Sequence, residues 1–238
     1  WSKWLARNPY YNNRVIRIRE GYVGQDLGDM TTRTYLIDKI DGPDTKGRVK
    51  ITARDILALA DNDKAQAPAA STGELIADID DSSTAPIRIT GAAAADYPAP
   101  GTVRINDELI TYTAVTTVDE TEIQLSGITR GTDGTEAQAQ SEGDRVQICL
   151  RYEAVRVDSL AREWLVDYGG VPAEFIPWTD WQAEADTWLA QFDLTGLITE
   201  PTGVQDLLAE ITEQCLFYVW WDERAQLIRL AAIKPPQS

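Results

Sequence analysis

Histidine is absent from the 238 residues of this sequence. Imidazole is the base in Ser-His-Asp and Cys-His catalytic arrangements, and it is a frequent ligand of zinc and haem. Both kinds of catalytic arrangement are therefore excluded for this chain. Zinc and haem sites that depend on a histidine ligand are excluded for the same reason.

Cysteine is scarce, because Cys149 and Cys215 are the two that the sequence contains. Two cysteines cannot build a disulfide framework. Cys149 falls in an expected strand, and Cys215 continues the apolar side of an expected helix. We therefore expect two free, packed thiols in a protein that is made in a reducing compartment.

Long hydrophobic runs are missing too. No apolar stretch approaches the roughly 20 residues that cross a bilayer, and the opening residues lack the pattern of a secretory signal. We therefore expect no membrane insertion by this chain. Because the sequence opens on Trp1 rather than methionine, we also expect further residues upstream.

Positive charge is in short supply. The 22 lysines and arginines face 38 aspartates and glutamates, which gives a formal net charge of −16. Such a surface repels phosphate backbones and anionic lipid, so we expect no specific nucleic-acid binding. The same charge keeps the protein soluble and favours a basic partner.

The first third of the chain reads as β-rich with one short helix. Residues 14–24 alternate apolar side chains with arginines, and residues 34–52 read as strand, turn and strand around Asp41-Gly42-Pro43-Asp44. A short helix follows to about Asn62, with Thr52 as its expected cap and Asp55 in its first turn. Residues 65–73 read as a linker.

The remainder divides into a β-only segment and a helical one. Residues 84–150 contain several strand-like stretches, which predict a small all-β unit that we call the inserted β module. Three helices are then expected, with caps at Asp158, Thr179 and Thr202 and a stop at Gly169-Gly170. A hairpin closes the chain. The predicted class is α+β, divided into 1–83, 84–150 and 151–238, with the last part packing on the first.

The loop between residues 126 and 147 crowds glycines and aspartates around Arg130. A phosphate-binding loop needs defined glycine spacing, a lysine and a following helix, and this loop has none of them. We therefore expect a structured connection in which Gly131 and Gly134 adopt backbone angles closed to other residues. The side chains of Thr132 and Asp133 should then bond the local backbone.

No catalytic, metal-binding or cofactor-binding residue is predicted, and no cofactor is expected. The acidic stretches 60–64 and 78–83 lack the spacing, the central glycine and the closing glutamate of a calcium loop, so they read as solvated turns. A pair of carboxylates for glycoside hydrolysis stays open as an alternative, because acids are plentiful and no pair stands out.

Tryptophans gather in the last third of the chain. Trp181 and Trp188 have helical spacing, which favours packing in the core. Trp220 and Trp221 are neighbours in an expected strand, so their side chains must point to opposite faces. One of the two is therefore expected to meet a second layer or a partner, which makes the pair a candidate interface.

Segments 97–115 and 125–147 together resemble a small β module found in many bacteriophage tail and baseplate proteins. Its pattern is I-x-x-E-x-I-x-Y, then T-R-G-x-x-G-T, then G-D-x-V. The matching residues are Ile105, Glu108, Ile110, Tyr112, Thr129, Arg130, Gly131, Gly134, Thr135, Gly143, Asp144 and Val146. Relatives often carry histidine before the last Gly-Asp, where this chain has Gln140-Ser141. That difference favours a shared scaffold over a shared site.

The flanking segments 47–68 and 216–233 are similar in style to the β-α units of phage tail hub proteins. A faint echo between 47–62 and 153–168 fits two tube-like units that flank the inserted module. The resemblance implies a baseplate hub at the tail tip of the virion, made in the bacterial cytoplasm. It further implies a homotrimer that continues the tail tube, contacts a tube ring protein and fibre proteins, and has no enzymatic activity.

Two other interpretations stay open. The inserted β module or the Trp-rich end could recognise host-surface glycan, or two carboxylates could hydrolyse cell wall. The acidic charge suggests a hypothesis for the hub itself, since like charge along a lumen would keep passing DNA from sticking.

Overall fold

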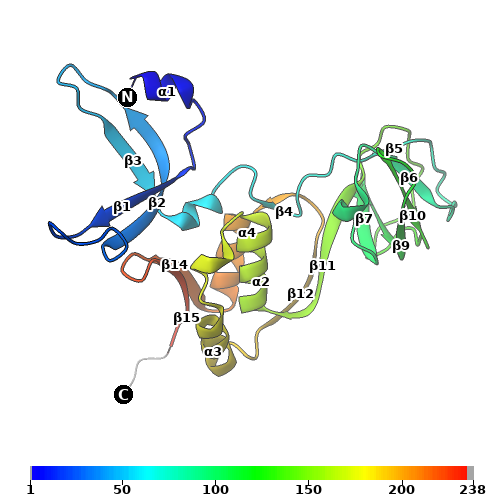
Figure 1. Cartoon of the computed structure of the whole chain (residues 1–238). Coiled ribbons are helices and arrows are strands. Elements are labelled where there is room, and N and C mark those ends of the chain that lie inside the picture. Colours follow the sequence, from blue (N-terminus) through cyan, green and yellow to red (C-terminus); the bar gives the residue numbers. More distant parts are fainter. Residues whose placement is uncertain (1, 235–238) are drawn as a thin grey trace.

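The computed structural model describes residues 2–234. The chain mixes helices with several small antiparallel sheets, as expected. Figure 1 shows three parts in a row: a three-stranded sheet, a helical body and the inserted β module. None of the helices within residues 2–234 combines the length and the apolar character that crossing a bilayer requires.

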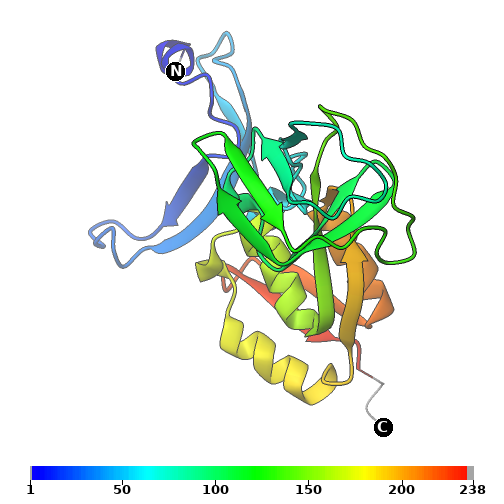
Figure 2. The same ribbon diagram turned by 90° about the vertical axis from the view of Figure 1, so that its right-hand side faces the viewer.

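The first part is the three-stranded sheet, which is antiparallel with the order β1-β2-β3. It projects from the body in both views (Figures 1 and 2). The inner half of β2 packs into the body through Leu36, whereas β1 is exposed along most of its length. The bounds are α1 Ser2–Arg7, β1 Val15–Glu20, β2 Thr31–Asp41 and β3 Lys50–Arg54.

The short helix after this sheet is a 3₁₀ turn, η1 (Ile56–Leu59). Its cap is Asp55, whose Oδ1 accepts a hydrogen bond from the amide of Ala58 at 3.2 Å. The expected cap at Thr52 is wrong, because Thr52 lies in β3 and pairs with Lys39. The expected linker also contains structure, since strand β4 (Gln66–Ala67) lies within it and Ala67 is fully buried.

The inserted β module packs two sheets around a core of its own. One sheet has the order β5-β6-β10-β9, and β7 and β8 belong to the other. The largest buried side chains of its core include Tyr112 and five isoleucines. The bounds are β5 Glu74–Leu75, β6 Ile87–Thr90, η2 Ala94–Asp96, β7 Gly101–Ile105, β8 Glu108–Tyr112, β9 Ala114–Thr117 and β10 Glu122–Ser126.

The module begins before the expected residue 84. Leu75 lies in the module core, and Ile79 pairs with Gln140, so the module takes in residues from Glu74 onward. At the other end, β11 (Gln147–Arg156) pairs with β7 at residues 147–149 and with β12 (Asp193–Ile198) from Leu150 onward, close to the expected end at residue 150. One continuous strand therefore joins the module to the body, and period-2 alternation does not show where its partner changes.

The helical body contains the three expected helices and the closing hairpin. Trp164, Trp181 and Phe217 are its largest fully buried side chains. Strand β13 pairs with β4 and so ties the body to the segment that connects η1 to the inserted β module. The bounds are α2 Val157–Glu163, the π-helical turn η3 Trp164–Tyr168, η4 Ala173–Phe175, α3 Trp178–Trp188, β13 Thr202–Gly203, α4 Val204–Gln214, β14 Phe217–Asp222 and β15 Leu227–Ala232.

The helix caps read from the sequence are wrong, although the helices exist. Helices α2 and α4 begin directly after the strands β11 and β13. The last residue of each hydrogen-bonded strand pair, rather than a capping side chain, therefore fixes where each helix begins. Pro177 precedes α3, where its fixed φ suits a helix start. Asp158 is buried inside α2 and pairs with Arg156, while Thr179 and Thr202 make no cap bond. The stop at Gly170 is confirmed by its φ of +68°.

Candidate functional site

The loop around Arg130 closes on a buried ion pair. The Arg130 side chain is 5% exposed and the Glu108 side chain is fully buried. Nε of Arg130 donates to Oε1 of Glu108 at 2.6 Å, and Nη2 donates to Oε2 at 2.8 Å. Such bidentate pairing fixes the orientation of both groups. The loop between residues 126 and 147 is therefore anchored on strand β8.

Every remaining polar atom of this pair also has a partner. Arg130 donates from Nη1 to the carbonyls of Asp80 and Ser83, at 2.8 and 3.2 Å, and from Nη2 to the carbonyl of Gln138 at 2.6 Å. Glu108 accepts the amides of Gly131 and Gln138 and the Nε2 of Gln140. A buried pair persists only when its other donors and acceptors are satisfied, and here they are.

The charge state of Glu108 follows from these partners. Burial acts to raise its pKa, but the bonds from Arg130, Gln140 and Gln138 outweigh burial and hold the pKa below its ordinary value. Glu108 is thus ionised at neutral pH, and both of its carboxylate oxygens accept hydrogen bonds. The ion pair ties segments 80–83 and 138–140 to strand β8.

The predicted glycine conformations in this loop are confirmed. Gly131 has φ +59° and Gly134 has φ +81°, in the left-handed region. Asp133 has φ +54° as well. Its carboxylate pairs with Arg151 at 2.6 Å instead of bonding the local backbone, so that part of the prediction is wrong. The Thr132 hydroxyl donates to the carbonyl of Leu109, which lies on β8.

The two neighbouring tryptophans do point to opposite faces. Trp221 packs against the body core and makes an edge-to-face contact with Phe175 at 5.7 Å between ring centroids. Trp220 is 36% exposed and lies beside the exposed Tyr218, with centroids 4.9 Å apart. The outward face of β14 therefore carries an aromatic pair, and Trp220 is the member of the predicted interface that reaches the surface.

Trp181 and Trp188, which were both expected in the core, behave differently from each other. Trp181 is buried, and its Nε1 donates to the carbonyl of Ile228 at 2.9 Å, as core packing requires. Trp188 is 42% exposed and lies under the ammonium of Lys234, so the core prediction is wrong for it. The reason is that α3 ends at Trp188 and Leu189 takes the next buried position.

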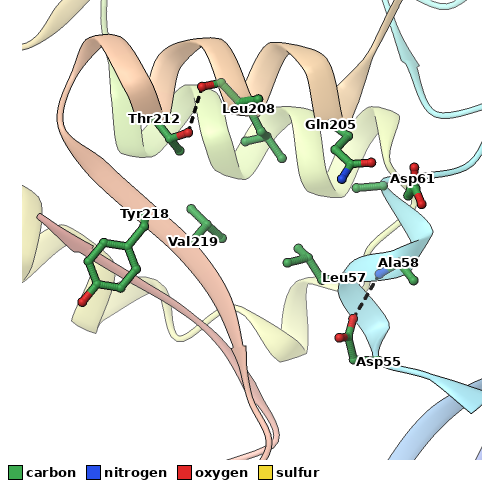
Figure 3. A pocket seen from close by; sticks show the side chains of 11 residues that line it. Asp55, Leu57, Ala58, Asp61, Gln205, Leu208, Thr212, Tyr218 and Val219 are labelled. Atoms are coloured by element: carbon green, nitrogen blue, oxygen red, sulfur yellow. Dashed lines mark hydrogen bonds between the residues drawn. The ribbon is translucent and has the colours of Figure 1, made fainter. Parts of the chain in front are cut away.

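A groove beside Tyr218 was not foreseen from the sequence. It lies between η1, α4 and β14 and has a volume of about 400 Å³. Leu57, Leu208 and Val219 face one another across it (Figure 3). Asp55 and Asp61 line the side formed by η1. We call this hollow the η1–α4 groove. Its lining comes from three segments far apart in the chain, so no local pattern marks it.

The acidic stretches read as turns in the structure as well. Asp80 accepts hydrogen bonds from the amide and hydroxyl of Ser82, and Asn62 accepts from the amide of Lys64. Within residues 2–234, no group of three or more Asp, Glu, Cys or His side chains is arranged to hold a metal ion.

The two cysteines are free thiols. Burial raises the pKa of Cys149 to about 12 and also raises the pKa of Cys215. Both are therefore protonated at neutral pH. Since the thiolate is the reactive form, neither has the character of a nucleophile.

Comparison of the chain with protein-family models, with curated protein sequences and with solved structures gave no match. The case for a function therefore rests on the residues and on the geometry described above.

Proposed function

We propose that this chain is a structural subunit of a bacteriophage tail tip, a baseplate hub that continues the tail tube and docks neighbouring tail proteins. In this role it changes no covalent bond. It works by presenting shaped faces to copies of itself, as a trimer, and to the rings above and below. The motif resemblance in the inserted β module supports a place in a phage tail. The projecting three-stranded sheet supports assembly with other chains.

The observation that carries the proposal is the projecting sheet. Val15 and Ile18 are 52% and 45% exposed, although they lie on opposite faces of β1. Strands β1 and β3 pair with β2 alone, so each leaves one edge open among the residues that the structure describes. Open edges and apolar residues on both faces favour pairing with another chain. In a ring of copies the same sheet would be covered.

The tip of this sheet extends the argument. The loop between β1 and β2 exposes Tyr22, Val23 and Leu27 at 85%, 109% and 63%. Within residues 2–234, these three large apolar side chains at the end of a two-stranded projection belong to neither hydrophobic core. A neighbouring ring would provide that cover, and contacts repeated by symmetry add up around a closed assembly.

Sedimentation equilibrium of the full chain tests the proposal, with Ile18→Asp as the variant. Val118→Asp is the matched control, because Val118 is 46% exposed and lies in the inserted β module. We expect the parent protein and Val118→Asp to show trimer mass or higher and Ile18→Asp to shift toward monomer. A parent protein that stays monomeric at every concentration contradicts the proposal.

A second candidate is recognition of host-surface glycan, which the exposed Tyr218–Trp220 pair favours. Aromatic rings on a surface form platforms on which the apolar faces of sugars stack. Titration of host polysaccharide into the full chain separates this candidate from the first. Saturable binding that Trp220→Ala abolishes would support glycan recognition, and assembly without such binding would leave the hub as the better account.

A further inference from the structure

The η1–α4 groove has a negative rim. Asp55 and Asp61 line it, and a second hollow that shares Ala60, Asp61 and Gln205 adds Asp63 and Asp206. No lysine or arginine lines either hollow among residues 2–234. Asp55 accepts the capping hydrogen bond of η1. None of these four carboxylates makes an ion pair within the described part of the chain.

The interior of the groove is apolar. Leu57, Leu208 and Val219 face its centre, and Tyr218, which is 48% exposed, stands at its edge (Figure 3). A volume of about 400 Å³ is enough to take one large side chain with part of its neighbours. The groove therefore suits an aromatic residue flanked by positive charge.

The N-terminal arm, residues 3–19, has that composition. It contains five cations and no carboxylate, in a chain whose net charge is −16. Among the described residues, none of the five forms an ion pair, whereas Arg33, Arg88 and Arg104 all do. Tyr10 lies at 83% exposure between Arg7 and Arg14, so it offers a large aromatic side chain with cations on both sides.

The arm cannot easily meet the groove of its own chain. Residues 15–20 are bound into the projecting sheet by pairing with β2, and the amide of Asn13 donates to the carbonyl of Ile37 at 2.8 Å. Figures 1 and 2 both place α1 and the outer part of the sheet beyond the body, away from α4. A second copy is the partner that the geometry leaves.

We propose that Tyr10 of one copy enters the η1–α4 groove of the next, with Arg7 and Arg14 against the acidic rim formed by Asp61, Asp63 and Asp206. The inference rests on the proposed self-assembly and names the surfaces through which it occurs. Arm and groove are different patches, so the contact is heterologous. Such a contact closes into a ring when the rotation between copies permits.

Zero-length carbodiimide cross-linking tests the contact between copies, because it joins an amine to a carboxylate that it touches. Lys3 is the one lysine of the arm. Equal amounts of ¹⁴N-labelled and ¹⁵N-labelled full chain are mixed, cross-linked and digested. We expect Lys3 joined to Asp61, Asp63 or Asp206 in peptides that combine the two labels. Links confined to one label overturn the inference.

Charge reversal gives a second readout, in sedimentation equilibrium at low salt. We expect Arg14→Glu to weaken association about fivefold to tenfold, since it turns an attraction at the rim into a repulsion. Adding Asp61→Arg should restore at least half of the loss. The matched control is Arg145→Glu, an exposed cation in the inserted β module that makes no ion pair within the described residues, and we expect it to change nothing.

Tyr10→Ala completes the set and leaves the charges in place. We expect it to weaken association at least tenfold and to remove the mixed-label links, because the buried aromatic anchors of an interface carry most of its energy. If the parent chain assembles but neither Tyr10→Ala nor Arg14→Glu has an effect, this inference is wrong and the proposed assembly stands. If the parent chain never assembles, the arm–groove contact and the proposed function are both wrong.

Discussion

The guanidinium of Arg130 forms two hydrogen bonds with the carboxylate of Glu108, at 2.6 and 2.8 Å, inside the inserted β module. Glu108→Gln leaves the buried guanidinium without its countercharge. We expect the free energy of unfolding of the module to fall by about 3–5 kcal/mol, because breaking one side of a buried pair strands the other charge. Urea unfolding followed by circular dichroism measures the change.

The control for this variant is an exposed pair. Asp44 and Arg48 lie 3.0 Å apart, with side chains 42% and 73% exposed. Arg48→Met should lower the free energy of unfolding far less than Glu108→Gln does, since solvent screens such exposed pairs. Equal effects of Glu108→Gln and Arg48→Met would show that the buried pair does not hold the loop.

The same pair makes the module sensitive to acid. The hydrogen bonds to Glu108 overcome burial and keep its folded-state pKa below the ordinary 4.5. A lowered folded pKa contributes stability that is fully present above the unfolded pKa and is lost as pH falls through the folded pKa. We therefore expect the difference in free energy of unfolding between the parent protein and Glu108→Gln to shrink as pH falls below about 4.5. A constant gap between the two from pH 7 to pH 3 would contradict this.

The two neighbouring tryptophans should separate stability from assembly. Trp221→Ala removes a ring that packs on Phe175 and on the body core, so we expect a loss of roughly 2–4 kcal/mol in urea unfolding. Trp220→Ala removes an exposed ring and should change stability by less than about 0.5 kcal/mol. In sedimentation of folded samples, Trp220→Ala should weaken association more than Trp221→Ala does. In the polysaccharide titration, Trp220→Ala should likewise weaken binding more than Trp221→Ala does. Equal stability losses would place both rings in the core.

Two glycines of the loop give a matched pair for backbone strain. Gly134→Ala places a methyl group in open space at φ +81°, so its cost is the left-handed conformation alone, roughly 1–2 kcal/mol. Gly131→Ala carries the same cost, and its new Cβ would also lie 2.8 Å from the amide nitrogen of Ala137. We expect Gly131→Ala to be the more damaging by about 1–3 kcal/mol. Melting temperatures that fall equally would argue against the tight packing at Gly131.

Local patterns in the sequence were sufficient for most elements. The alternation of Val15, Ile16 and Ile18 with arginines predicted β1, and the apolar spacing of Val204, Leu207, Leu208 and Ile211 predicted α4. The signal for α4 works because it depends on which face of a single helix is buried. Strand β1 buries neither face, and its β-branched residues are what favour a strand there. The opposite orientations of Trp220 and Trp221 followed from the same geometry.

Contacts between distant segments could not be predicted in this way. Glu108 and Arg130 stood in one motif, yet their pairing depends on a loop that folds back over β8. The helix starts failed because paired backbone, rather than a capping side chain, precedes α2 and α4. The start of the inserted β module was placed at 84 rather than 74, because β5 has only two residues and its pairing with β6 leaves no local pattern. The η1–α4 groove needs three elements to meet and is visible only in the folded chain.

The central claim is that this chain functions by assembling through its projecting sheet and N-terminal arm. Electron microscopy of the purified full chain, at concentrations where sedimentation reports association, tests this most directly. The account predicts closed rings of a fixed number of copies, with the β1-β2-β3 sheets joined between neighbours and the inserted β modules at the periphery. A field of single particles with free sheets, or aggregates without a fixed copy number, would contradict it.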